Sequence, residues 1–292
     1  MAVSKYEILL KVVELGSLTK AAEHMGYTQS GVSHVISSLE TDIGFPLLAR
    51  KRNGTKLTPD GERILPAIRA IVNSTEQLDQ IISAIKGVNA GTVRIGVFTS
   101  VAVHWLPKII KTFQKDFPNV EFVLKNGDYH DIEQWLAEGS IDLGFVNLPL
   151  QQDCPCIPLQ EDRLLAVLPK DHRLANMYRF PLSELANEPF ISLLENSDHD
   201  ARRVIEHAGV SPNIKFTTKD DYAIIAMIEN GLGISIMPEL LLQGRADRVC
   251  VMELSEPLTR TIALATPTIS QSSPCVQKFT QYIIDFFQNT PA

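Results

Sequence analysis

The chain has 292 residues, enough for about two domains, and 45% of them are hydrophobic, enough to fill the cores of both. It holds 27 lysines and arginines against 34 acidic residues, so any affinity for nucleic acid must come from a local basic patch. No apolar run approaches the roughly 20 residues of a bilayer span, and the first residues lack the continuous apolar core of a signal peptide, which predicts a cytoplasmic protein.

Two short amphipathic helices joined by a glycine turn are expected between Ser17 and Glu40, after a first amphipathic helix at the N-terminus. In the earlier helix of the pair, the apolar residues follow the i, i+3, i+4, i+7 spacing of one buried face: Leu18, Ala21, Ala22 and Met25. Ser17 suits its N-cap and Gly26 its left-handed end, while Thr28 can cap the next helix. This pattern predicts a helix-turn-helix.

The second helix of the pair presents a face suited to DNA. Its inward residues are Val32, Val35, Ile36 and Leu39, and no acidic residue precedes Glu40 on the outward face. Short donors and acceptors on such a face match base edges and phosphate oxygens in a major groove. An ordinary helical hairpin is the alternative. The candidate DNA-contacting residues are Thr28, Gln29, Ser30, Ser33, His34 and Ser37.

A basic hairpin is expected directly after the helix pair, in Leu48 to Asp60. Asn53-Gly54 is a strong signal for a two-residue turn between strands. Basic side chains surround this turn, and Arg50, Arg52 and Lys56 are the candidate phosphate contacts. Residues 1–60 hold 7 basic and 6 acidic residues, which leaves 20 and 28, a net charge of −8, for the remainder.

One long helix is expected from Pro59 to about Lys86, with Thr58 as its cap and a local kink at Pro66. Apolar residues alternate spacings of four and three, which is typical of a coiled-coil seam: Ile64, Ile68, Ile71, Thr75, Leu78, Ile82 and Ile85. Since one helix cannot bury this seam alone, we expect dimerisation through it, with packing onto the rest of the chain as the alternative. Residues 87–91 read as a hinge.

The remainder, from Thr92, alternates strands and helices. Strands are expected at 93–98, 120–124 and 141–146 with helices at 106–117 and 131–138, a β-α-β-α-β order that predicts a parallel sheet. A second run has strands at 164–168, 190–193, 214–217, 233–237 and 261–265, and helices from about 200, at 222–230 and at 275–287. Two crossings, at 147–161 and 265–270, would join the two parts.

This order of parts resembles the LysR-type transcriptional regulators. Gly16–Glu23, the run Ser33…Leu39-Glu40…Gly44, and the later segments Leu106-Pro107, Gly139–Gly144, Leu168–Ala175 and Gly231–Pro238 are similar to landmarks of that family. Ser30 and Gly31 stand where the family commonly has proline and alanine, and His34 where a basic residue often follows the serine. The base preference of relatives therefore does not transfer to this chain.

The resemblance implies an N-terminal winged helix-turn-helix that is mainly α, a long linker helix, and an α/β two-lobed, periplasmic-binding-protein-like effector domain. The expected boundaries are 1–58 for the DNA-binding domain, 59–90 for the linker and hinge, and 91–292 for the effector domain. Within the last, lobe I covers 91–161 and 266–292, and lobe II covers 162–265. The resemblance also implies that two dimers form a homotetramer.

The effector is expected between the two lobes. Thr99-Ser100 ends the first strand, where hydroxyls and free N–H groups suit a small carboxylate or oxyanion; a simple helix cap is the alternative. The resemblance supports Thr99 and Ser100 as effector-facing, with Asn147, Asn196 and Ser197 as further candidates. Asp128, His199 and Asp200 also lie near strand ends and leave the sign of the ligand's charge open.

The leading hypothesis is a sequence-specific, effector-responsive DNA-binding regulator that acts on double-stranded operator DNA and has no catalytic residue, metal or cofactor. An enzyme using Asp128, His130 and Asp131, or His199 and Asp200, is one alternative, but no nucleophile elbow, phosphate loop or HExxH motif accompanies them. A solute-binding protein is another, opposed by the wing. The cysteines, Cys154, Cys156, Cys250 and Cys275, are expected to be reduced and inert, although Cys154-Pro-Cys156 could form a redox pair.

Overall fold

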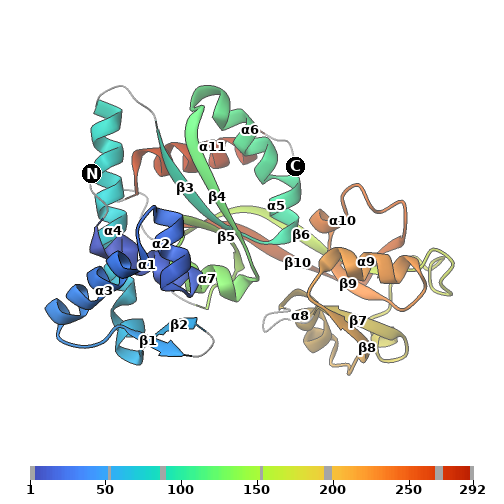
Figure 1. Cartoon of the computed structure of the whole chain (residues 1–292). Helices are drawn as coiled ribbons and strands as arrows, with labels where there is room; N and C mark the ends of the chain where they lie inside the picture. Colours follow the sequence, from blue (N-terminus) through green and yellow to red (C-terminus); the bar gives the residue numbers. More distant parts are fainter. Residues whose placement is uncertain are drawn as a thin grey trace. The chain divides into compact units, whose positions relative to one another are not determined.

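The computed structural model describes residues 4–51, 54–85, 90–151, 154–193, 199–266 and 272–289. The chain divides into two compact units, one of residues 1–88 with 137–140 and the other of residues 89–136 with 141–292. Figure 1 labels the helices and strands of both. None of the described helices is both long and apolar enough to cross a membrane.

The first unit contains the predicted helix-turn-helix. Helices α1 (Lys5–Leu15), α2 (Leu18–Met25) and α3 (Gln29–Ile43) pack around one hydrophobic core. The Ser17 hydroxyl accepts from the backbone N–H of the first turn of α2, and Gly26 ends that helix with a left-handed φ of 71°. The predicted caps and turn are therefore confirmed. The buried core residues are Ile8, Leu9, Val12, Leu18, Ala21, Ala22, Val32, Ile36, Leu39, Leu47 and Ile68.

The wing is an antiparallel hairpin of β1 (Leu48–Lys51) and β2 (Gly54–Leu57). It is fastened to the turn before α2, because the Thr55 N–H donates to the Gly16 carbonyl at 2.8 Å. Gly54 has a φ of 118°, and a Cβ there would lie 2.7 Å from the same carbonyl oxygen. Only glycine allows this approach, so the Asn53-Gly54 signal has a steric cause as well as a turn preference.

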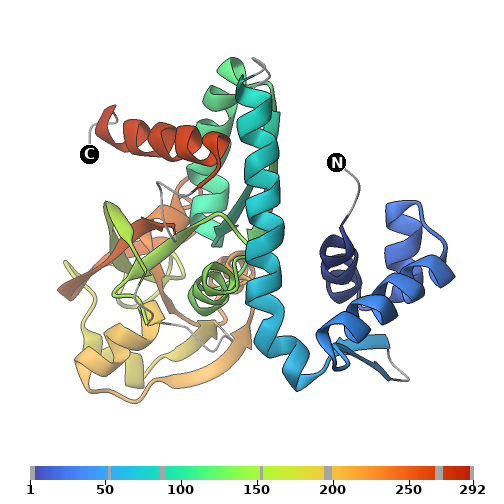
Figure 2. The same cartoon turned by 90° about the vertical axis from the view of Figure 1, so that its left-hand side faces the viewer.

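Helix α4 (Pro59–Ile85) forms over nearly the whole predicted length and continues past Pro66 (Figure 2). The Thr58 hydroxyl accepts from the Gly61 N–H at 3.0 Å and so caps its start. The apolar seam divides into two parts along the helix. Its beginning packs into the core of the first unit, whereas Ile71, Leu78 and Ile85 are 47%, 51% and 81% exposed.

The second unit is built on a six-stranded sheet in the order β4-β3-β5-β10-β6-β9. β3 runs parallel to β4 and β5, and the two long strands β6 and β10 pair antiparallel with each other. Its elements are β3 (Ala90–Val97), α5 (Thr99–His104), α6 (Leu106–Asp116), β4 (Asn119–Asn126), α7 (Tyr129–Ala137), β5 (Leu143–Leu148), β6 (Cys156–Leu168), η1 (Leu182–Ala186), β7 (Pro189–Leu193), α8 (His199–Ala208), β8 (Asn213–Thr218), α9 (Asp221–Glu229), β9 (Ser235–Pro238), α10 (Glu239–Leu242), β10 (Cys250–Ala265) and α11 (Pro274–Asn289).

Within this unit the elements gather into two lobes with separate cores (Figure 1). The first lobe contains β3, β4, β5, α5, α6, α7 and α11. The second contains η1, β7, β8, β9, α8, α9 and α10. β6 and β10 run through both lobes, so the connection between them is a pair of hydrogen-bonded strands rather than two loops.

These two strands are longer than the sequence predicts. The sequence predicts strands only at 164–168 and 261–265, and it predicts the second crossing at 265–270. β10 instead carries the chain across earlier, since Thr261–Ala265 already pairs with β5 of the first lobe. The parts of these strands that the sequence does not predict carry exposed polar residues, such as Glu253 and Glu256. Because such residues have weak strand propensity, the sequence indicates a loop there. The sequence does not predict the short elements η1 and α10, and it predicts only the start of a helix at Thr99-Ser100, where α5 begins.

Candidate functional site

The exposed surface of α3 brings together the residues predicted to contact DNA. Gln29, Ser30, His34 and Ser37 are exposed and Ser33 is half-buried, while no acidic residue occupies the first turn. The Thr28 hydroxyl accepts from the Gly31 N–H at 3.1 Å and so caps the helix. A Cβ at position 31 would lie only 3.1 Å from this hydroxyl, which explains why glycine fits there.

The wing follows α3 directly and carries the predicted basic positions. Arg50 lies in β1 opposite Thr55, and Lys56 is exposed on β2, whereas Arg52 lies outside the described residues. The Glu40 carboxylate of α3 accepts from the backbone N–H groups of Leu47 and Leu48, at 2.7 and 3.0 Å. These two bonds hold the end of α3 against the start of the wing, so the helix and the hairpin form one body.

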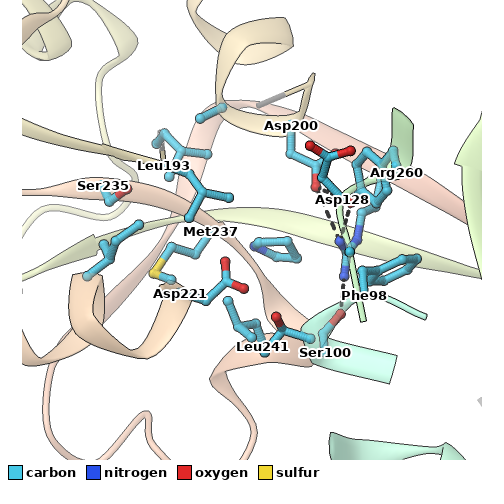
Figure 3. Close-up of a pocket in the computed structure, with 17 residues that line it drawn as sticks. Phe98, Ser100, Asp128, Leu193, Asp200, Asp221, Ser235, Met237, Leu241 and Arg260 are labelled. Atoms are coloured by element: carbon cyan, nitrogen blue, oxygen red, sulfur yellow. Dashed lines mark hydrogen bonds and ion pairs between the residues drawn. The ribbon is translucent and has the colours of Figure 1, made fainter. Parts of the chain in front are cut away.

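A cavity of about 90 Å³ lies between the two lobes of the second unit, with walls from both. Figure 3 shows Arg260, Asp200 and Ser100 joined by hydrogen bonds or ion pairs, with the Asp221 carboxylate pointing into the same space. The described residues that line the cavity are Phe98, Thr99, Ser100, Gly127, Asp128, Tyr129, Leu193, Asp200, Ala201, Asp221, Ile224, Ser235, Ile236, Met237, Pro238, Leu241 and Arg260.

Arg260 is the centre of the polar wall and uses all of its donors within the protein. Its Nε and Nη2 donate to Asp162 Oδ2 at 2.9 and 2.6 Å, and Nη2 also donates to Ser100 Oγ at 2.9 Å. Its Nη1 donates to Tyr129 Oη at 2.5 Å and to Asp200 Oδ2 at 3.2 Å. A guanidinium has five N–H groups, and these five contacts account for all of them. Arg260 is 3% exposed.

The same cluster joins the lobes directly through Asp200 of α8. Tyr129 Oη, at the start of α7 in the first lobe, donates to Asp200 Oδ2 at 2.7 Å. Asn147 Nδ2, from β5 of the first lobe, donates to Asp200 Oδ1 at 3.2 Å. Burial alone would lower the pKa of Arg260, but its charged and polar neighbours raise it overall, so the guanidinium stays protonated. Burial raises the pKa of Tyr129, which keeps its proton as a donor.

Two further carboxylates face the cavity. Asp128 forms a reciprocal cap with Asp131: its Oδ1 accepts from the Asp131 N–H at 2.8 Å. Asp221 begins α9 in the second lobe and lies within hydrogen-bonding reach of the Thr99 hydroxyl of the first. Burial raises the pKa of Asp221, despite the opposing effects of Thr99 and Arg260.

Part of the predicted effector site lies on this cavity. Thr99 and Ser100 line it, whereas Asn147 lies behind Asp200, and Asn196 and Ser197 are outside the described residues. Neither hydroxyl caps α5, whose N-cap is Phe98 without a side-chain bond. Three carboxylates, of Asp128, Asp200 and Asp221, and the guanidinium of Arg260 line the same cavity as Thr99 and Ser100.

Sequence reasoning missed the residues that organise the cavity: Arg260, Asp162, Tyr129 and Asp221. Arg260 and Asp162 are register partners on β10 and β6, where cross-strand pairing places opposite charges together. An isolated arginine just before the apolar run of 262–265 was a usable signal, but its partners lie up to 160 residues away. The cysteines carry free thiols within the described residues.

The winged helix-turn-helix and the cavity together define a DNA-binding regulator with a ligand-binding domain. Residues 3–62 match the family model of the bacterial regulatory helix-turn-helix protein of the lysR family, and residues 86–288 match the LysR substrate binding domain. The chain therefore belongs to the LysR family of transcription regulators. Its curated relatives are transcriptional regulators, so the protein is a regulator and not an enzyme.

Similar proteins cover almost the whole chain. The HTH-type transcriptional regulator YvbU of Bacillus subtilis is 31% identical over 290 residues, which cover 98% of this chain and 99% of that protein. A full-length OxyR variant from Pseudomonas aeruginosa matches with a TM-score of 0.76 at 19% identity, covering 98% of this chain and 97% of OxyR. Full-length CbnR in complex with its target DNA matches with a TM-score of 0.66 at 20% identity over 96% of this chain and 97% of CbnR. These two structures share the fold.

Proposed function

We propose that this regulator binds a specific operator through α3 and the wing, and that a small molecule in the cavity between the lobes switches the geometry of that binding. One observation carries the proposal: the cavity is walled by both lobes, and Arg260 contacts the first lobe through Ser100 and the second through Asp200. A ligand there touches both lobes and can favour one inter-lobe arrangement over another.

The proposed DNA contacts are Thr28, Gln29, Ser30, Ser33, His34 and Ser37 on α3, and Arg50, Arg52 and Lys56 on the wing. Exposure of the α3 side chains and the absence of acidic residues in its first turn support the first group. The Glu40 bonds support a shared role for helix and wing, because they keep the two at a fixed spacing. Such a body can read base edges with α3 while the wing holds phosphates.

We further propose a homodimer through α4 and a tetramer of two such dimers, acting in the cytoplasm where the chromosome lies. The exposed apolar side chains along the later part of α4 support the dimer, since a helix with this face gains stability by pairing. A two-fold pair of DNA-reading helices also matches a pseudo-palindromic operator. The proposed boundaries are 1–58 for DNA binding, 59–90 for the linker, and 91–292 for the effector domain.

The switch needs only a modest coupling energy. A ligand shifts the equilibrium between two inter-lobe arrangements by the difference between its binding free energies for them. A coupling free energy of about 1–3 kcal/mol is typical. If the inter-lobe angle sets the spacing of the DNA-reading heads, this energy changes operator bending or footprint length more than bare affinity.

Footprinting on the DNA upstream of the gene tests the proposal. The full-length protein should protect a defined site with steep salt dependence, and the substrates of enzymes encoded by flanking genes should alter the footprint. Thr99→Val should remove that effector response while operator binding without effector stays near normal. Thr112→Val, an exposed threonine on α6, is the matched control and should respond like the wild type. An effector response that survives in Thr99→Val would place the site elsewhere.

A further inference from the structure

We propose that the cavity between the lobes takes a small organic cation, an ammonium or guanidinium group on a short apolar chain, with Asp221 as its counter-ion. This inference rests on the proposed function, because it names the ligand class of the cavity assigned there. The observations that carry it are the use of Arg260 within the protein, the surplus of carboxylates, and the apolar walls beside Asp221.

Arg260 is not available to an anionic ligand. Its five N–H groups are all directed at protein oxygens, and its charge is opposed by two carboxylates, Asp162 and Asp200. An anion could approach only by displacing one of these partners and leaving that carboxylate buried without its cation. Breaking a buried pair in this way is strongly unfavourable. The one arginine on the wall therefore organises the cavity and does not recognise an acid.

Asp221 has the opposite character. It lies on the cavity wall, and no lysine, arginine or histidine among the described residues forms an ion pair with it. Its described polar neighbour is the Thr99 hydroxyl. A half-buried carboxylate with hydroxyl support but no cation is a receptor for a positively charged donor, since that donor would remove the unfavourable desolvation of the carboxylate.

The surrounding charges act in the same direction. Among the described residues the wall carries the carboxylates of Asp128, Asp200 and Asp221 against the single guanidinium of Arg260. Asp128 belongs to the first lobe and Asp221 to the second, so a cation between them faces both lobes. Residues 61–292 carry a net charge of −8. This field favours entry of cations over anions.

The size and walls of the cavity define the rest of the ligand. A cavity of about 150 Å³ holds benzene, so the roughly 90 Å³ here corresponds to a ligand of about four non-hydrogen atoms unless the lobes move apart. Ile224, Met237 and Leu241 are apolar residues of the cavity wall, and Figure 3 shows Met237 and Leu241 near Asp221. A primary ammonium on a short alkyl chain satisfies both the carboxylate and this surface.

Calorimetric titration of the full-length protein tests the ligand class with three probes of similar size: propylammonium chloride, sodium propionate and 1-propanol, at constant ionic strength. We expect saturable binding of propylammonium and none of propionate or propanol. Asp221→Asn should weaken propylammonium binding at least ten-fold. Asp128→Asn, on the opposite lobe, provides a second variant and should weaken binding as well.

Asp220→Asn is the matched control, because it removes the same charge one residue away. Asp220 is exposed, does not line the cavity and caps α9 through the N–H groups of Tyr222 and Ala223, a role that asparagine also fills. Its affinity for propylammonium should stay within two-fold of the wild type. Saturable binding of propionate, or propylammonium affinity unchanged in both Asp221→Asn and Asp128→Asn, would overturn the inference.

Operator binding is measured on the same protein samples, so that the two claims fail separately. Specific protection of upstream DNA together with propionate binding would leave the regulator in place and overturn the cationic ligand. Propylammonium binding that depends on Asp221 but never alters the footprint would support the ligand class and count against the proposed switch.

Discussion

Among the described side chains that line the cavity, Arg260 has the most charged and polar partners. Two carboxylates, two hydroxyls and one guanidinium are gathered at the point where the strands cross between lobes. A buried ion cluster gives little net stability over apolar packing, but removal of its cation leaves both carboxylates uncompensated. The residue is therefore costly to replace, although its N–H groups all donate to protein oxygens rather than being free for a ligand.

We predict that Arg260→Met destabilises the protein by about 3–5 kcal/mol, because Asp162 and Asp200 would remain buried without their cation. Urea unfolding at neutral pH measures this. Arg163→Met is the control: Arg163 is the next residue after Asp162, is exposed, and pairs with Glu239 and Glu253 at the surface. It should cost at most about 1 kcal/mol. Equal effects of the two substitutions would contradict the central role of Arg260.

The raised pKa of Asp221 predicts a stability difference that depends on pH. Burial raises this pKa, with Asp200 and Asp220 adding to the effect and Thr99 and Arg260 opposing it. Between the ordinary carboxyl pKa and the raised one, the folded state binds more protons than the unfolded state, so stability falls as pH rises through this range. Asp221→Asn removes that cost.

Thermal unfolding of wild type and Asp221→Asn from about pH 3 to pH 7 checks this prediction. The variant should melt at a higher temperature than the wild type at pH 7, and the gap should close toward pH 3, where the aspartate is protonated in both states. Asp220→Asn, at an exposed carboxylate, should show a much smaller gap. A variant less stable than the wild type at pH 7 would show that Asp221 holds the fold together.

The residues that we propose to read bases and those that we propose to hold phosphates should differ in the property of DNA binding that their loss changes. Replacing Gln29 or His34 on the exposed face of α3 by alanine should alter sequence preference, by about 1–3 kcal/mol for each good base contact. Lys56→Ala on the wing should weaken binding to all sequences and reduce the slope of affinity against salt by about 1. Fluorescence titration on matched and scrambled DNA separates the two, and unchanged preference in both α3 variants would refute their assignment.

At the scale of elements, the apolar stripe of α4 is buried in a core at its start and exposed along its later turns. Its first turns contribute Ile64 and Ile68 to the helix-turn-helix core, and its later turns leave the stripe exposed. Because exposed isoleucines and leucines at a spacing of seven are typical of helix pairing, the later turns are the dimer surface in our proposal.

Leu78→Asp should therefore dissociate the dimer, since a carboxylate in an apolar helix seam remains desolvated and unpaired. Light scattering across protein concentration measures the mass. Thr112→Asp adds the same charge to an exposed position of α6, away from α4, and should leave the mass unchanged. If Leu78→Asp keeps the wild-type mass, the stripe packs elsewhere.

Periodic elements could be predicted from sequence, and elements defined by distant partners could not. α2, α3 and α4 carry local information in caps, glycine turns and apolar spacing, so their bounds agree with the prediction within a few residues. The unpredicted parts of β6 and β10 contain many exposed polar residues. They are strands because β6 and β10 pair with each other. Short α5 and α10 have too few residues for any period to show.

The cavity shows the same division. Thr99 and Ser100 follow a predicted strand and could be placed at its end, whereas Arg260 and Asp162 meet only because two crossing strands adopt one register. The sequence around Asp221 indicates only the start of a helix. Asp221 lines a cavity because the other lobe supplies the opposite wall. Local pattern thus predicts where a binding loop lies, while the sign of its charge requires the fold.

At the scale of the whole molecule, Asp200 links the lobes through hydrogen bonds from Tyr129 and Asn147. Tyr129→Phe removes one of its two first-lobe donors and should shift the lobes toward a more open arrangement by about 1–3 kcal/mol, the cost of a lost buried hydrogen bond to a charged group. Fluorescence energy transfer between labels at exposed Lys115 and Lys215 measures this opening. Tyr178→Phe, at a side chain that is 91% exposed, is the control. Identical transfer in both variants would contradict the link.

The position of this link has a genetic consequence. Substitutions at Tyr129, Asn147 or Asp200 change how the lobes are joined without touching the DNA-reading helix or removing Asp221 from the cavity. A selection for regulators that act without their inducer should therefore yield mutants at these three codons, scattered through the gene yet adjacent in space. Selection for lost operator recognition should instead yield mutants in the codons of the helix-turn-helix and wing, and the two classes should complement differently in mixed oligomers.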